Sequence, residues 1–225
     1  MVLIPPGTFQ MGCSPGLASP CDGWETPVHT VTLSQPYYLG RYEVTQAQWV
    51  AKMGSNPSEF HWQSDAQSRP VDSVSWEMAQ GFLTSTGMRF PTEAEWEFAY
   101  RAGTMTAYHS MPGYPSGTND EAQTTTIAWR SGNASGQTHA VGTKAGNGFG
   151  LHDMSGNVWE WCYDRLGSYE SSAQTDPVGP DLGMYRVIRG GAWDSSSGHC
   201  RSSYRGGHAP DWDFSHNGFR VARSP

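Results

Sequence analysis

Cysteines offer the most distinctive chemistry in this 225-residue chain, because thiolates bind soft metals and thiols form disulfides. The four cysteines make neither a CxxC motif nor a Cys/His pattern with zinc spacing, which argues against a metal–thiolate centre. Cys13 and Cys21 flank a Gly/Pro/Ser loop, and this spacing leaves open a loop-closing disulfide or two unpaired surface thiols. Cys162 and Cys200 lie in strand-like apolar contexts, so we expect two buried structural thiols.

Three histidines near the carboxyl end offer a second kind of chemistry. His199, His208 and His216 could gather around a transition metal, or they could make ligand binding pH-sensitive because imidazole titrates near neutrality. Their lack of a fixed spacing on one predicted element argues against the metal. His29, by contrast, falls within an alternating pattern and is predicted to be a core or edge residue of a strand.

The acidic run between Pro91 and Gly103 could supply carboxylates for acid–base chemistry. Thr92 and Glu95 have the spacing of a capping box, and acidic residues in a first turn favour the helix dipole. We therefore interpret these glutamates as capping and solvating residues of a helix.

Oxygen-bearing side chains also gather at the predicted turn 155–157. Asn157 and Glu160, together with backbone carbonyls of the turn, match the mixed oxygen set that a hard cation such as calcium prefers. Hydrogen bonds from an Asx turn explain the same residues without a metal. The residues alone leave both interpretations open.

The elements that must position these groups are short. Strands are predicted at 3–4, 8–11, 28–33 and 37–40, between Pro and Gly turns. Cap signals predict helices at 45–54, 75–87 and 92–103, the last with Gly103 as terminator. Residues 105–146 are rich in Gly, Ser and Thr and weakly patterned, which is typical of a long functional or mobile loop.

Composition favours one turn-rich domain over residues 1–225. Glycine (27), tryptophan (10) and tyrosine (10) are abundant while charged residues make up 16%, which suits an aromatic core with little regular structure. A net charge of −7 with 14 Lys and Arg argues against a nucleic-acid partner. Apolar runs fall short of the roughly 18 residues of a membrane span, and the first residues do not form a signal peptide, so we expect no membrane insertion.

The last forty residues, 186–225, alternate a patterned frame with polar fillings. In the frame, apolar and Arg residues alternate as on strands with one buried face; it comprises residues 186–193, 200–205, 210 and 217–222. The fillings have no helical or strand period; they are residues 194–199, 206–209 and 211–216. Because loops on a rigid frame are common binding sites, we predict a ligand-binding surface here.

Several motifs follow one another from end to end of the chain: Met11-Gly12, Tyr42-Glu43-Val44-Thr45, Asn56-Pro57-Ser58, Pro70-Val71, Val74-Ser75-Trp76, Arg89-Phe90-Pro91-Thr92-Glu93-Ala94-Glu95-Trp96-Glu97, Gly156-Asn157-Val158-Trp159-Glu160-Trp161, Arg189-Gly190-Gly191 and Gly218-Phe219-Arg220. Together they resemble the formylglycine-generating enzyme (sulfatase-modifying factor) domain over essentially the whole chain. The resemblance implies an α+β fold of the C-type lectin-like kind, with short antiparallel strands, about three helices and much irregular structure. It also implies a structural calcium ion near the turn, held by Asn157 and Glu160 with backbone oxygens around Asp153, Ser155 and Gly156.

The resemblance further implies copper chemistry, for which the residues are incomplete. The family's enzyme oxidises a substrate cysteine with copper held by two thiols after the Gly190-Gly191 pair, the first thiol five residues before the second. Cys200 stands at the second position, but Ser195 replaces the first thiol and Ala192 replaces a serine. A hydroxyl is a hard, protonated and poor ligand for Cu(I), so we expect no copper and no formylglycine-generating activity.

Family members without the thiol pair include domains appended to other enzymes and the variable proteins of diversity-generating retroelements. In variable proteins, adenine-directed mutagenesis scatters substitutions, commonly at AAC or AAT codons, which never yield Lys, Glu, Gln, Met or Trp. The three fillings obey this rule except at Trp212. The sequence therefore favours a non-catalytic, ligand-binding variable protein. The alternatives are a metal-dependent oxidase or oxygenase using Cys200 with a neighbouring histidine, and an accessory domain of a larger enzyme.

The predicted surface combines rigid aromatic side chains with small polar ones, as antibody loops do. Trp193, Trp212, Phe214 and Tyr204 would supply apolar area, although core packing explains Trp193 and Tyr204 equally well. The predicted ligand-binding residues are Trp193, Asp194, Ser195, Ser196, Ser197, Gly198, His199, Ser203, Gly206, Gly207, His208, Asp211, Trp212, Asp213, Phe214, Ser215 and His216. The expected ligand is a protein, a peptide or a glycan.

Overall fold

Short strands and a few helices build the chain, for which the computed structural model describes residues 1–17 and 21–225. The strands are β1 (Val2–Ile4), β2 (Gly7–Met11), β3 (His29–Leu33), β4 (Tyr37–Leu39), β5 (Ala128–Trp129), β6 (Ser155–Gly156), β7 (Trp159–Arg165), β8 (Gln174–Thr175), β9 (Arg186–Arg189), β10 (Arg205–His208), β11 (Asn217–Gly218) and β12 (Ala222–Arg223). The α-helices are α1 (Gln46–Met53), α2 (Trp76–Thr86) and α3 (Glu93–Arg101). The 3-10 helices are η1 (Gly23–Glu25), η2 (Ala66–Ser68), η3 (Glu121–Thr126) and η4 (Ser197–Cys200).

The α-helices begin at the residues that the cap signals predict. Their N-cap side chains accept a backbone N–H of the first turn; they are Thr45, Ser75 and Thr92. Gly54 and Gly87 end α1 and α2 in the left-handed conformation, as expected. Helix α3 ends earlier than predicted, because Ala102 and not Gly103 takes the left-handed C-cap position.

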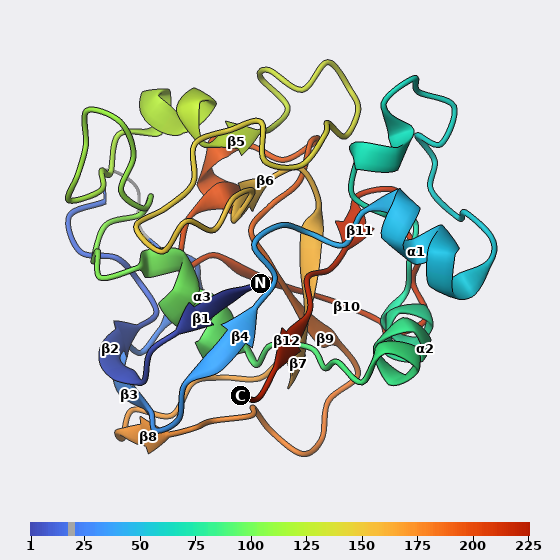
Figure 1. Cartoon of the computed structure of the whole chain (residues 1–225). Helices are drawn as coiled ribbons and strands as arrows, with labels where there is room; N and C mark the ends of the chain where they lie inside the picture. The colour runs from blue at the N-terminus through green and yellow to red at the C-terminus, as the bar shows by residue number, and fades with distance from the viewer. Residues whose placement is uncertain (18–20) are drawn as a thin grey trace.

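The two ends of the chain meet in one sheet, β1-β4-β12, which places the N- and C-termini near each other (Figure 1). A four-stranded sheet, β10-β9-β7-β11, carries much of the C-terminal segment, and β2-β3-β8 and β5-β6 form two smaller sheets. The longer pairs are antiparallel, as expected, but β11–β7, β3–β8 and β5–β6 are parallel. Parallel pairing needs long connections, and the irregular segments of this chain provide them.

Strand β10 corrects the loop expected at 206–209. Residues 206–208 pair antiparallel with residues 186–188 of β9. A Cβ atom at Gly207 would lie 2.7 Å from the end of the Leu166 side chain, so a larger residue here requires Leu166 to move. Glycines carry no side-chain alternation, which is why the sequence pattern missed the strand.

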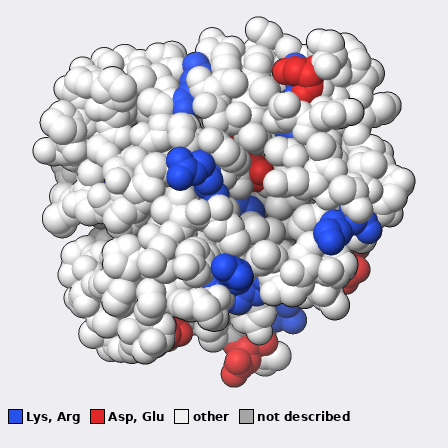
Figure 2. All heavy atoms as spheres, viewed as in Figure 1, with Lys and Arg blue, Asp and Glu red and all other residues white. Residues whose placement is uncertain are grey.

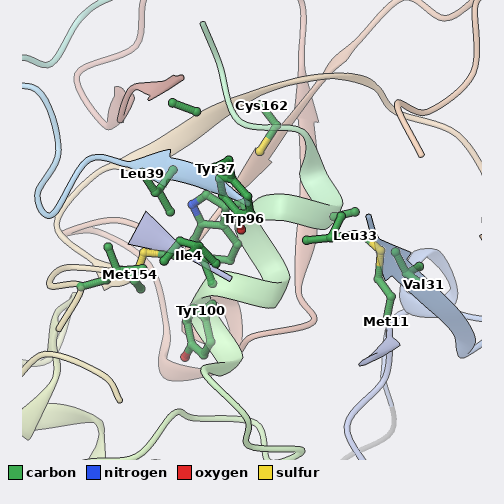
Figure 3. Packing of buried hydrophobic residues seen from close by; sticks show 14 of the residues in the cluster. Ile4, Met11, Val31, Leu33, Tyr37, Leu39, Trp96, Tyr100, Met154 and Cys162 are labelled. Carbon is green, nitrogen blue, oxygen red and sulfur yellow. The ribbon is translucent and has the colours of Figure 1, made fainter. Parts of the chain in front are cut away.

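An aromatic core forms around α3. Trp96 and Tyr100 of α3 pack with Ile4 of β1 and with Tyr37 and Leu39 of β4 (Figure 3). A second buried cluster packs α1 and α2 against β7 and β9. Burial of these large rings provides the aromatic core that the composition predicts.

Four arginines of the C-terminal segment are buried and paired with glutamates from distant parts of the chain, while Arg186 is partly exposed and Arg223 is exposed. The pairs are Arg189 with Glu97, Arg201 with Glu25, Arg205 with Glu93, and Arg220 with Glu160. Solvation is therefore the wrong explanation for Glu93 and Glu97, which lie in the interior, whereas Glu95 makes the predicted capping box with Thr92. Because a buried charge needs a partner, these pairs fix the segment to α3, β7 and η1.

The cysteines have structural surroundings. Cys13 and Cys21 form a disulfide, which decides between the two possibilities that the sequence leaves open. Cys162 and Cys200 are buried thiols, as predicted. His29 is buried on β3, in agreement with its place in an alternating strand.

Among the described residues, none of the helices has the length and apolarity that a membrane crossing needs. On the face shown in Figure 2, charged side chains of both signs lie in small, scattered groups. That face therefore lacks the continuous basic surface typical of nucleic-acid binding among the residues the structure describes.

The buried pairs make a quantitative prediction. Glu97→Gln removes the negative charge that Arg189 and Arg101 share. The unfolding free energy of the variant should therefore be about 3–5 kcal/mol lower than that of the unchanged protein. Glu170→Gln is the control, because it makes the same change at an exposed carboxylate and should alter the unfolding free energy by less than about 0.5 kcal/mol. Urea unfolding measures both, and equal effects would contradict a scaffold that depends on buried pairs.

Candidate functional site

The structure places most of the predicted binding residues at the surface. Six are exposed: Asp194, Ser196, Asp211, Trp212, Asp213 and Phe214. Nine are partly exposed: Trp193, Ser197, Gly198, His199, Gly206, Gly207, His208, Ser215 and His216. Two, Ser195 and Ser203, are buried.

One part of this surface is an aromatic cluster, formed by His208, Trp212, Phe214 and His216. The ring centroid of Phe214 lies 5.2 Å from that of Trp212 and 5.3 Å from those of His208 and His216. Trp161 of β7 lies beneath, 6.0 Å from His208. Residues from β10 and from the loop after it therefore form one apolar surface.

Polar contacts hold this cluster in place. His216 Nδ1 lies 3.0 Å from an Asp194 carboxylate oxygen, which joins the first filling to the third. Partial burial raises the pKa of Asp194, but the hydrogen bond and charge of His216 outweigh this and leave it below its usual value. The Trp193 indole donates to the Ser215 carbonyl at 3.1 Å. Burial, with His216 nearby, lowers the pKa of His208 to about 4, so His208 is neutral at neutral pH.

His199 lies in a second aromatic group. Its ring centroid is 4.6 Å from Tyr204 and 6.2 Å from Trp159 of β7. Trp159 and Trp161 alternate with Glu160 along β7, so both indoles face the fillings while Glu160 faces Arg220 in the interior. The three histidines are thus divided between two groups, and the described residues contain no cluster of three metal-ligating side chains.

Ser195 and Ser203 are corrections to the predicted contact set. The Ser195 hydroxyl accepts the Ala192 N–H at 3.0 Å and closes the turn after the glycine pair. The Ser203 hydroxyl donates to buried Glu25 at 2.5 Å, beside Arg201. Both side chains are buried in the observed arrangement, although Ser195 belongs to a filling by its position in the sequence. Polarity alone did not distinguish them from their exposed neighbours.

The sequence pattern missed three aromatic residues that pack against this surface, of which Trp159 and Trp161 are buried beneath it. Trp159 and Trp161 lie in the middle of the chain, and only the sheet brings them beneath the fillings. Tyr185 precedes the segment and its ring centroid lies 6.1 Å from that of Trp212. The sequence held a signal for the contact of Tyr185, because Leu182, Met184 and Tyr185 are apolar residues in an otherwise polar Gly/Pro stretch.

The surroundings of Cys200 do not favour thiolate chemistry. Its side chain is buried and its thiol donates to the Ser196 carbonyl at 3.5 Å. Burial raises the pKa of the Cys200 thiol to about 12, so the protonated form dominates at neutral pH. The other thiol, Cys162, belongs to a different buried cluster.

At the turn 155–157, the predicted calcium ligands bind other protein groups. Both Glu160 carboxylate oxygens accept hydrogen bonds from Arg220 at 2.6 Å, and one of them also accepts the Trp96 indole N–H at 2.7 Å. The Asn157 carboxamide oxygen accepts the His139 N–H at 2.9 Å. A guanidinium already neutralises the carboxylate, so these side chains do not fit a divalent cation in the observed arrangement.

The remaining residues of the predicted calcium set are equally engaged. The Asp153 carboxylate accepts the Gly142 N–H at 2.6 Å, and burial raises the pKa of Asp153 to about 6. The Ser155 hydroxyl binds Tyr100, and the Gly156 N–H donates to the Gly190 carbonyl. The Asx-type interpretation of this turn matches these contacts. From them we expect no calcium at the turn, contrary to what the resemblance implies, and this question is left to a solution measurement.

The small mixed sheets, capped helices and irregular surface loops define a C-type lectin-like domain. The model of the Sulfatase-modifying factor enzyme 1-like domain matches residues 1–225, and the chain belongs to this family. The formylglycine-generating enzyme of Thermomonospora curvata is 32% identical over 295 residues, covering 100% of this chain and 93% of that protein.

Two further relatives differ in kind. Serine/threonine-protein kinase pkn1 of Chlamydia pneumoniae is 34% identical over 250 residues, and this chain spans 38% of its length. The solved structure of Treponema denticola variable protein 1 superimposes with a TM-score of 0.88 at 31% identity, covering 100% of this chain and 95% of that one. The family thus includes relatives named as enzymes and one named as a variable protein.

The engaged ligands at the turn lead to a metal prediction. Calcium chloride at millimolar concentration should leave the melting temperature unchanged relative to EDTA, because Arg220 already neutralises Glu160. A site filled to about a thousand times its Kd would stabilise the fold by about 4 kcal/mol, which is a shift of several degrees. Such a shift on calcium addition would show that the turn rearranges to bind the ion.

Proposed function

We propose that this protein is a non-catalytic ligand-binding protein that displays diversified C-terminal loops, as the variable protein of a diversity-generating retroelement. The observation that carries the proposal is the division of the segment 186–225 into two kinds of position. Four frame arginines point inward to buried glutamates, whereas most of the filling residues are exposed or partly exposed. Two of these, His199 and His208, lie beside Trp159 and Trp161.

This division suits a surface whose side chains change. Substitutions at exposed positions away from special features usually alter stability by less than about 0.5 kcal/mol. Stability here comes from the buried pairs and the aromatic core, so recognition residues can vary without unfolding the domain. The likeness to Treponema denticola variable protein 1 supports the same interpretation. Trp212 is the exception, because the expected codons do not yield tryptophan.

The alternative of a metal-dependent oxidase or oxygenase receives support from relatives named as formylglycine-generating enzymes. The residues of this chain favour the oxidase less. Cys200 is a buried neutral thiol, and Ser195, which stands in place of the first thiol, accepts a hydrogen bond from the Ala192 N–H. Copper or iron titration combined with oxygen-consumption measurements on a cysteine-containing peptide distinguishes the two proposals. Turnover that depends on Cys200 would favour the oxidase.

An accessory domain of a larger enzyme is a further candidate, supported by the match to 38% of the chlamydial kinase. Gene context tests it, since a kinase or other catalytic domain in the same reading frame is required. An accessory domain could bind a ligand through its exposed loops, and it would not need oxidase chemistry of its own.

The genomic test of the main proposal is direct. A near-identical template repeat should lie close to the gene, with adenines at codons for exposed fillings such as Asp194, Ser196 and Asp213. Sequencing of related isolates should show substitutions at these positions and none at Arg189 or Arg205. A gene without such a repeat, or with changes spread evenly over the frame, would contradict diversification.

A matched pair of variants tests the division without knowledge of the ligand. Ser196→Tyr adds a ring at an exposed position and should change the unfolding free energy by less than about 0.5 kcal/mol. Ser195→Tyr adds the same ring at a buried position whose hydroxyl accepts a hydrogen bond from Ala192. It should lower the unfolding free energy by about 1–3 kcal/mol or more. Equal losses of unfolding free energy for the two variants, measured by urea unfolding, would contradict the division into buried and exposed positions.

A further inference from the structure

A group of exposed apolar side chains lies just before the C-terminal segment. Leu182 and Met184 are 86% and 79% exposed, and Tyr185 is 39% exposed. Such exposure of neighbouring large apolar residues is unusual on a soluble domain and marks contact surfaces. None of the three belongs to the fillings or to the frame.

The loop that carries these residues is held against the scaffold. The Arg165 guanidinium donates to the Gly183 carbonyl at 2.6 Å, and the Leu166 N–H donates to the Tyr185 carbonyl at 2.9 Å. Tyr185 in turn packs beside Trp212, which contacts Phe214. The exposed apolar residues of the loop therefore continue the aromatic cluster of the fillings.

Acidic side chains accompany the apolar strip that Leu182, Met184 and Tyr185 form with Trp212 and Phe214. Its exposed carboxylates are those of Asp181, Asp194, Asp211 and Asp213. The arginines of the same region are occupied, since Arg165 donates to Gly183 and Arg186 donates to the Tyr163 carbonyl while stacking on Trp76. Hydrogen bonds to carbonyls leave both guanidinium charges in place, but the four exposed carboxylates outnumber them, so net negative charge remains available for a partner.

We infer that the binding surface extends from Trp212 and Phe214 over Tyr185 to Met184 and Leu182, and that its partner is a protein segment presenting aliphatic side chains flanked by lysine or arginine. This inference rests on the proposed ligand-binding function and adds to it the partner class and a fixed part of the contact. Aromatic residues and methionine are enriched at protein interface cores, and charge complementarity selects the cationic partner.

The geometry distinguishes this partner from smaller ligands. Small molecules bind in concave sites that enclose most of their surface, whereas Leu182 and Met184 project outward. Two cavities of about 420 and 470 Å³ are lined by other residues, including Glu93 and Tyr169 in one and Tyr37 and Arg89 in the other. A sugar could stack on Trp212, but the aliphatic part of the strip offers it no hydrogen bonds.

The test uses the full chain and two probes, a phage-displayed random peptide library and an array of neutral oligosaccharides. Selected peptides should combine aliphatic with Lys or Arg residues. Their affinity should fall at least about tenfold, about 1.4 kcal/mol, for Leu182→Ser combined with Met184→Ser and for Asp211→Asn combined with Asp213→Asn. Leu3→Ser and Glu170→Gln are matched controls at exposed positions elsewhere and should leave affinity unchanged. Circular dichroism checks the fold of each variant.

The other outcomes separate this inference from the function on which it rests. Peptides that lose affinity with Trp212→Ala or Phe214→Ala but not with Leu182→Ser and Met184→Ser would overturn the extended strip and leave the binding function intact. Oligosaccharide binding that is lost with Trp212→Ala, without peptide binding, would overturn the partner class alone. If neither the peptide library nor the oligosaccharide array yields a binder whose affinity depends on Trp212 or Phe214, the extended strip and the proposed binding function are both overturned.

Discussion

Buried ion pairs between arginines of the C-terminal segment and glutamates elsewhere are the constraint on which the rest of the structure depends. Arg189 and Arg205 reach Glu97 and Glu93 on α3, and Arg220 reaches Glu160 on β7. A guanidinium in the interior is stable only with a carboxylate partner and satisfied hydrogen bonds, so each pair specifies where its strand must lie. The segment is thereby held at several points while its intervening loops carry little of the fold's stability.

This arrangement accounts for a family that contains both enzymes and a variable protein. The scaffold fixes a surface beside the glycine pair, and the residues placed on that surface decide its chemistry. In this chain the position of the first thiol holds Ser195, which closes a turn, and Cys200 is a neutral buried thiol. What remains at the surface is a mixture of aromatic rings, carboxylates and imidazoles, which suits the proposed recognition function.

The candidate surface also shows how recognition can combine fixed and changeable parts. Trp159 and Trp161 come from a central strand and form a fixed base beneath the fillings. Tyr185 joins this base to the neighbouring loop through Trp212. This buried base would support the fillings in every variant, Tyr185 would add a fixed contact, and the fillings would select among partners by charge and shape.

The sequence by itself determined the family, the starts of all three α-helices and the positions of most exposed fillings, because caps, periodicity and motif order are local properties of the chain. It did not determine that Gly206 to His208 form a strand, since glycines carry no alternation, nor that Ser195 and Ser203 are buried while Ser196 is exposed. Only the tertiary structure decided the partners of Glu93, Glu97 and Glu160, because a buried carboxylate and its arginine are separated by many residues. It also decided which rings meet at the surface, since Trp159, Tyr185 and Trp212 become neighbours only when sheet and loops pack together.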